Sequence, residues 1–158
     1  MVDGANVAWN HGHSFFPSFL GIQIACKKAV REGYTSVVIF NRRYHRIWAE
    51  NIEELKKMDG VFIVPPLSDS QSDDRVMIDY TTNKNAVLLS NDKFRDHIRR
   101  ELKSRRDYAK KWVDENVITY HFHGGELYFG CKEKQVSQRL DSADLELISS
   151  SLQKKIPK

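Results

Sequence analysis

The sequence predicts an α/β fold in which helices flank both faces of a central, mostly parallel sheet. Short β-rich apolar runs alternate with segments of helical periodicity along the 158 residues. The apolar runs contain few polar residues, which is typical of parallel strands that are buried on both faces. The alternation itself is that of βαβ units, so we expect a layer of helices on either side of the sheet.

Four short apolar runs are predicted strands, and a very short run at Met1 and Val2 adds another. The four runs cover residues 37–40, 61–64, 86–89 and 117–120. Apolar residues at helical spacing predict helices before the stops expected at Gly33 and Gly60. They are Phe19, Ile22, Cys26 and Ala29 in the first segment, and Ile52, Leu55 and Met58 in the second. Two adjacent glycines within residues 123–126 predict a hairpin turn.

The composition is that of one globular domain. Hydrophobic residues make up 41% of the chain and charged residues 29%, and no apolar run reaches the ~20 residues that span a bilayer. The sequence shows no secretory leader and has only two cysteines, Cys26 and Cys131, so we expect a reducing compartment, the cytoplasm. The chain becomes polar after residue 130, which predicts a C-terminal extension, residues 131–158, with a short helix around residues 144–148.

Basic residues gather in two segments that could contact a phosphate-bearing partner. The net charge of +4 and the pI near 9.0 are weak evidence on their own. One cluster lies at residues 42–46, after a predicted strand, and the other lies between Lys93 and Lys111. The alternative is a solvated helix face with internal ion pairs. Because acidic motifs lie nearby, contact with nucleic acid is favoured.

Three acidic motifs lie near the ends of predicted strands or at the start of a predicted helix. They are Asp3 with Asn6, Asp73 with Asp74, and Asp92 with Asp96. Ligands in open α/β sheets bind beyond the carboxyl ends of the strands, so these oxygens are expected to share one edge. Grouped carboxylates bind a hard divalent cation. Each motif has a structural alternative: a turn at Asp3, a helix start at the second motif, and helix caps at the third.

In combination, the motifs resemble the metal-dependent ribonuclease domain of the NYN/PIN superfamily, closest to its Zc3h12a-like (Regnase) branch. The matching residues are Asp3-Gly4-Ala5-Asn6-Val7-Ala8, His11-Gly12, Asp73-Asp74-Arg75, and Ser90-Asn91-Asp92 with Phe94-Arg95-Asp96. The resemblance implies that residues 1–130 form a PIN-like (NYN) three-layer domain. It also implies endonucleolytic cleavage of single-stranded or loop RNA, in mRNA turnover or RNA silencing.

The resemblance assigns roles to individual residues. The implied catalytic residues are Asp3, Asn6, Asp73, Asp74, Asp92 and Asp96, and the implied metal ligands among them are Asp3, Asp74, Asp92 and Asp96. The expected RNA-binding residues are Arg42, Arg43, Arg46, Arg75, Lys93, Arg95 and Arg99. Mg²⁺ suits such a site and Mn²⁺ is a credible substitute. Water activated by the metal is expected to attack phosphorus in line.

Other functions remain open at this stage. A nuclease-like domain could act as an RNA-binding or scaffold module without cleaving, although the retained acids argue against it. A receiver-like or phosphatase-like domain needs a lysine or hydroxyl partner after a later strand, which we do not identify. The six histidines raise a metal-free acid–base mechanism or a zinc site, but zinc lacks clustered cysteine partners. Expected partners are RNA, with a homo-oligomer or RNA-decay and silencing proteins as further candidates, and no membrane.

Aromatic residues are further candidates for RNA contact. Trp9, Trp48, Phe94 and Trp112 could stack on bases, although an isolated aromatic residue is more often part of the core. His11 is expected either to pack or to contact RNA.

Overall fold

The structure is a computed structural model that describes residues 1–68, 72–94 and 106–130, with the side chains of residues 106–109 left aside. Several predictions lie outside the described residues. They concern Arg95, Asp96, Arg99, Cys131 and the helix around residues 144–148.

The centre of the fold is a five-stranded sheet in which every neighbouring pair of strands is parallel. Its strands are β1 (Val2–Asp3), β2 (Ser36–Ile39), β3 (Val61–Ile63), β4 (Leu88–Leu89) and β5 (Val117–Ile118), in the order β3-β2-β1-β4-β5. The α/β class predicted from the sequence is confirmed. Successive strands are added on one side of β1 up to β3 and on the other side from β4, so the order reverses beside β1. Such a switch point is where open α/β sheets bind ligands.

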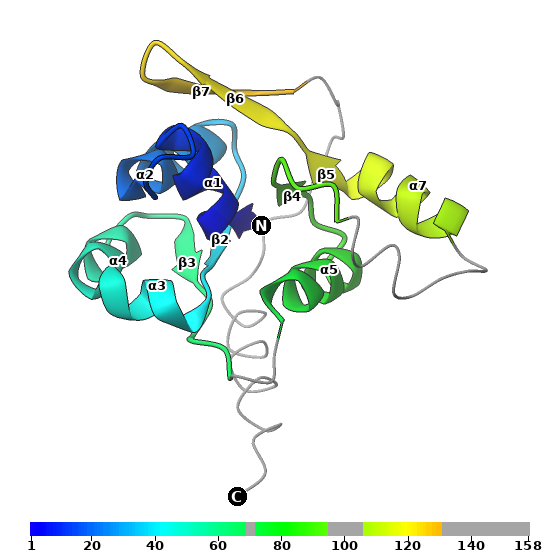
Figure 1. The fold of residues 1–158 in the computed structure, drawn as a ribbon, viewed down its shortest axis with the longest axis horizontal. Coiled ribbons are helices and arrows are strands. Elements are labelled where there is room, and N and C mark those ends of the chain that lie inside the picture. Colours follow the sequence, from blue (N-terminus) through cyan, green and yellow to red (C-terminus); the bar gives the residue numbers. More distant parts are fainter. Residues whose placement is uncertain (69–71, 95–105, 131–158) are drawn as a thin grey trace, which may run out of the picture.

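Helices cover both faces of the sheet (Figure 1). One group is α1 (Gly4–His11), α2 (Phe19–Arg31), α3 (Arg42–Ile47) and α4 (Ala49–Lys56), and the other is α5 (Asp73–Asn83) and α7 (Arg106–Asn116). Alternate strand residues face alternate layers. Val38 packs in the cluster that includes Ile22 and Leu55, whereas Val37 packs in the cluster that includes Met77. The three-layer arrangement therefore has a core on either side of the sheet.

Three of the four predicted strands are shorter than their apolar runs, whereas the run at 37–40 becomes Ser36–Ile39 with its length unchanged. The runs at 61–64 and 86–89 shrink to Val61–Ile63 and Leu88–Leu89, and the run at 117–120 divides after Ile118. Burial on both faces holds for β2 but not for β3, where Phe62 is 37% exposed. β3 is an edge strand of the sheet, which explains this exposure. The two predicted helix stops are confirmed: Gly33, at φ +85°, lies just after α2, and Gly60, at φ +71°, lies beyond the end of α4.

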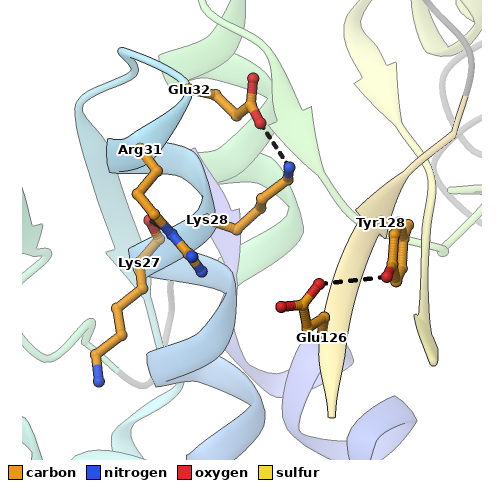
Figure 2. Close-up of polar contacts among 6 residues, drawn as sticks. All are labelled: Lys27, Lys28, Arg31, Glu32, Glu126 and Tyr128. Atoms are coloured by element: carbon orange, nitrogen blue, oxygen red, sulfur yellow. Dashed lines mark hydrogen bonds and ion pairs between the residues drawn. The ribbon is translucent and has the colours of Figure 1, made fainter. Parts of the chain in front are cut away.

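A two-stranded antiparallel hairpin, β6 (Tyr120–His123) and β7 (Glu126–Phe129), projects beyond the sheet. Gly124 and Gly125 turn the chain with φ +57° and +80°, as a tight hairpin requires, and this confirms the predicted turn. The hairpin lies against α2, where the Lys28 ammonium is 5.8 Å from the centre of the Phe129 ring. Figure 2 shows this boundary: Lys28 pairs with Glu32 along α2, and the Tyr128 hydroxyl donates to Glu126 on β7.

Candidate functional site

Asp3 lies where β1 ends and α1 begins, and its carboxylate is held by both neighbouring elements. Oδ1 accepts the backbone N–H of Asn6 at 3.0 Å, which caps the first turn of α1. Oδ2 accepts the hydroxyl of Ser90, just beyond β4, at 2.9 Å. Asp3 is therefore a helix cap, where the sequence offered a turn as the structural alternative, and also a buried carboxylate, 7% exposed, at the switch point of the sheet.

Gly4 allows α1 to start so close to the neighbouring strand. A Cβ atom at this position would lie 2.5 Å from the ring of Phe40 and 2.7 Å from the carbonyl oxygen of Ile39. Any side chain here would push the first turn of α1 away from β2. The Asp-Gly pair thus fixes the Asp3 carboxylate at the sheet edge through close packing, and not through an unusual backbone angle.

The environment of Asp3 disfavours its negative charge. Burial, with a smaller contribution from the nearby carboxylates of Asp74 and Asp73, raises the pKa of Asp3 to about 6, against the lowering effect of the Asn6 and Ser90 hydrogen bonds. Asp73 and Asp74 occupy the first turn of α5 and are half-buried. The structure therefore brings the second acidic motif within electrostatic reach of the first.

Asn6 and Asn91 tie this edge of the sheet together. The carboxamide oxygen of Asn6 accepts the backbone N–H of Asn91 at 2.9 Å and the hydroxyl of Tyr120 at 2.7 Å. The carboxamide of Asn91 in turn donates to the carbonyl oxygen of Tyr120 at 2.9 Å and accepts its N–H at 3.0 Å. Asn91 thus continues the pairing between the β4 and β5 segments with its side chain, which is why the predicted strand at 117–120 divides.

Asp92 is exposed and closes a tight turn after β4. Its Oδ1 accepts the backbone N–H of Phe94 at 2.7 Å, and its own N–H donates to the Ser90 hydroxyl at 3.1 Å. Phe94 has φ +49° and is buried. The side chain of Asp92 therefore supports the turn, while Ser90 links this turn directly to Asp3.

The oxygen donors are of the type that a hard divalent cation prefers. Within the described residues, no group of three His, Cys, Asp or Glu side chains is close enough to hold a metal ion. The predicted ligand Asp96 lies outside that part of the chain. The raised pKa of Asp3 is a second indication that a cation suits this site, because a cation would offset the repulsion among Asp3, Asp73 and Asp74. The donor chemistry and the local charge fit Mg²⁺ or Mn²⁺.

Comparison with known proteins identifies the family. The family described as "Zc3h12a-like Ribonuclease NYN domain" matches residues 1–141. The chain belongs to this family. Over 136 residues, the NYN domain is 29% identical to "Endoribonuclease rege-1" of Caenorhabditis elegans, a stretch that is 77% of this chain and 20% of that protein. The chain thus spans about one fifth of this curated relative.

A solved structure agrees with the fold. The crystal structure of nuclear proteinaceous RNase P 2 (PRORP2) from A. thaliana superimposes with a TM-score of 0.62 at 24% sequence identity. The match covers 81% of this chain and 28% of that chain. At this identity the likeness establishes the NYN fold, namely the parallel sheet with its flanking helices.

The predicted RNA-binding cations occupy different parts of the NYN domain. Arg42, Arg43 and Arg46 are exposed on α3, which begins just after β2. Because Ile39 of β2 is in register with Asp3, α3 starts at the same sheet edge as the acids. Arg75 on α5 is 3.9 Å from Asp79, and Lys93 is exposed in the turn after β4.

Some of the aromatic and histidine candidates are packed in the core, and others are exposed. Trp48 and Phe94 are core residues, whereas Trp9 is 40% exposed and donates its indole N–H to the Tyr44 hydroxyl at 2.6 Å. Trp112 is half-buried and donates to Thr82.

His11 packs edge-on against Phe122 and bonds to Ser18, which is the packing role expected for it. His121 and His123 are exposed on the hairpin, and His121 stacks on Tyr128.

Sequence reasoning missed three residues of this site as functional positions. Ser90 and Asn91 belonged to a recognised motif, but no pattern assigned them a role of their own. Tyr120 was placed in a strand, and no local pattern links it to Asn6, which is 114 positions away. The available signal was two polar residues directly after the buried strand β4, at the edge where ligands bind.

In the part of the chain that the structure describes, no helix has the length and apolar character needed to cross a membrane.

Proposed function

We propose that this NYN domain is an endoribonuclease that cleaves single-stranded or loop RNA with the help of Mg²⁺. The single observation that carries the proposal is the buried Asp3 carboxylate at the switch point, made more basic by burial and by the acids of α5. Membership of a ribonuclease family and the similarity to an endoribonuclease support the choice of RNA as the substrate. The site thus combines fixed carboxylates with an approach flanked by the arginines of α3.

The residues of the chain prepare the site before any substrate arrives. The Asn6 N–H and the Ser90 hydroxyl fix both oxygens of Asp3, so this carboxylate does not have to reorient when RNA binds. Asn6 is in turn held by Asn91 and Tyr120. Preorganised polar groups of this kind cost little reorganisation during the reaction. We assign Asn6 a positioning role, because both of its observed bonds hold the edge together.

Asp3, Asp74, Asp92 and Asp96 would hold the cation, with Asp73 beside them. When bound, Mg²⁺ would neutralise the grouped carboxylates, activate the attacking water and stabilise charge that develops on the phosphate. Mn²⁺ would serve similarly. The arginines of α3 would bind phosphates on either side of the scissile bond. The biological setting that we propose is mRNA turnover or RNA silencing in the cytoplasm, with proteins of those processes or further copies of the chain as partners.

A fluorescent single-stranded RNA assay tests the proposal. The parent protein should cleave in Mg²⁺ and stop in EDTA, and Asp3→Asn should lose most activity, at least a hundredfold, while it stays folded. Asp79→Asn is the matched control, because Asp79 is an exposed aspartate on α5 whose observed partner is Arg75. Near-parental turnover by a folded Asp3→Asn protein would overturn the assignment. RNA binding without any cleavage by the parent would favour a binding module instead.

A further inference from the structure

A group of exposed apolar side chains lies on α1, the α1–α2 loop, α2 and α3. The described residues contain seven exposed large hydrophobic side chains, and five of them fall between residues 9 and 47. We call these five the aromatic platform: Trp9, Phe15, Phe16, Leu20 and Ile47. Phe15 is 87% exposed and Phe16 is 61% exposed, and nothing else in the described structure covers the two phenyl rings. Leaving this much apolar surface in water has a large free-energy cost.

Packing beneath the platform connects its parts. Tyr44 stacks on Trp48 with ring centres 4.5 Å apart, and Trp48 meets Phe19 edge-on at 5.4 Å. Three platform positions are tied to this buried cluster: Trp9 bonds to Tyr44, and Leu20 and Ile47 are chain neighbours of Phe19 and Trp48. The loop that carries Phe15 and Phe16 folds back on the end of α1. There the Ser14 N–H donates to the Trp9 carbonyl oxygen at 2.9 Å.

The platform lies at the same edge of the sheet as Asp3. α2 must begin at the carboxyl edge, because it leads back to the start of β2 and its first residue, Phe19, stacks on Phe40 just beyond the end of β2. α3 begins at that edge directly after β2. α1 starts at Asp3 itself and reaches α3 through the bond from Trp9 to Tyr44. An extended chain bound at Asp3 could therefore continue along α1 onto the platform.

Charge in the segment that carries the platform is mainly positive. Between residues 4 and 49 the chain has six Lys or Arg residues and one acid, Glu32. Glu32 pairs with Lys28 near the far end of α2, beside the hairpin (Figure 2). The three arginines at 42, 43 and 46 are exposed on α3, next to Tyr44 and Ile47. A polyanion is thus attracted to the platform, whereas a protein partner would have to supply its own acids.

We propose that the aromatic platform binds the bases of single-stranded RNA that extends beyond the Asp3 site, while the arginines of α3 bind its phosphates. Aromatic side chains beside a basic groove bind single strands in this way, because every base has a face that can stack. This inference rests on the proposed function for its substrate, since it names the part of the domain that holds the flanking nucleotides. Duplex RNA cannot use the platform, because its bases are already stacked in the helix.

Binding measured without cleavage tests the platform. The variant Phe15→Ala/Phe16→Ala is made in an Asp3→Asn protein and titrated in EDTA with a single-stranded oligonucleotide, a duplex of the same sequence and a dinucleotide. We expect affinity for the single strand to fall by roughly tenfold to a hundredfold, which is the loss of one or two stacked bases. Affinity for the duplex and the dinucleotide should stay the same. The salt dependence should also be unchanged, because no phosphate contact is removed.

Phe62→Ala is the matched control, since it removes an exposed phenyl ring from the edge strand β3 and should leave all affinities unchanged. Equal single-strand affinity of the double variant and its parent would overturn the proposal. So would reduced self-association in sedimentation with unchanged RNA affinity, which would make the platform a contact between copies. Separate cleavage assays of the protein with Asp3 intact distinguish the two proposals. If that protein does not cleave RNA, but RNA binding still depends on Phe15 and Phe16, the ribonuclease function is contradicted and the platform proposal stands.

Discussion

The two halves of the sheet's carboxyl edge are built in opposite ways. Between β1 and β4, polar atoms are buried and bonded to each other, as in the contacts of Asp3 with Ser90 and of Asn6 with Tyr120. Beside β2, aromatic and basic side chains extend into solvent on α3 and the α1–α2 loop. The contrast suggests a division of work, in which the fixed half carries out chemistry and the exposed half holds a flexible substrate.

The largest stability effect should come from the charge of Asp3. Its folded pKa of about 6 lies above the unfolded value of 3.8, so ionised Asp3 disfavours the folded state by roughly 3 kcal/mol at neutral pH. This penalty is absent below pH 3.8, grows as the pH rises through the folded pKa, and is complete above it. Asp3→Asn should therefore be the more stable protein at pH 7.5 in EDTA, and its advantage should shrink towards pH 4. Thermal melts of both proteins across this range check the prediction, and a constant difference would contradict it.

The next prediction tests whether Asp74 and Asp92, in the fixed half of the edge, act as metal ligands or as caps. If Asp74 and Asp92 bind the cation, Asp74→Asn and Asp92→Asn should each reduce the Mg²⁺-induced rise in melting temperature. A tenfold loss of affinity removes about 1.4 kcal/mol of metal-linked stability. A pure capping role predicts instead a loss of ~0.5–2 kcal/mol in EDTA with the full magnesium shift intact. Melts with EDTA and with millimolar Mg²⁺ distinguish the two outcomes.

A smaller effect should follow from one hydroxyl group. Tyr120→Phe removes the donor to the Asn6 carboxamide and leaves the Asn91 N–H bond to the same oxygen. We expect a loss of about 1 kcal/mol in the free energy of unfolding, the usual contribution of one hydrogen bond. Urea unfolding measures it. If the substitution has no effect on stability or on cleavage, the Tyr120 contact does not support the site.

Much of the fold could be predicted from the sequence, because its signals are local. Apolar runs marked the strands, and adjacent glycines marked the hairpin turn. The strand boundaries were less accurate, because pairing partners decide them: the run at 117–120 divides where the Asn91 side chain replaces a strand neighbour. The exposure of Phe62 depends on strand order, which no local pattern reveals.

The sequence pointed to the acids of the site and to Asn6, but not to the contacts that hold them. Asp3, Asp73 and Asp74 stood out because acidic motifs recur near a strand end and a helix start, and the structure brings them within electrostatic reach of each other. Tyr120 and Asn6 meet across the whole domain, so their contact requires the three-dimensional fold. The platform was missed for a related reason: Phe15 and Phe16 look like core residues until their exposure is known.

Single-turnover cleavage of a single-stranded RNA, measured over a range of protein concentrations, tests the division of work most directly. Arg42→Glu/Arg43→Glu should raise the half-saturating concentration by about tenfold or more and flatten its salt dependence, while the maximal rate stays near that of the parent. Asp74→Asn should lower the maximal rate and leave half-saturation unchanged. If the arginine variant mainly loses maximal rate, or Asp74→Asn mainly loses affinity for RNA, the two halves of the edge do not divide chemistry from binding.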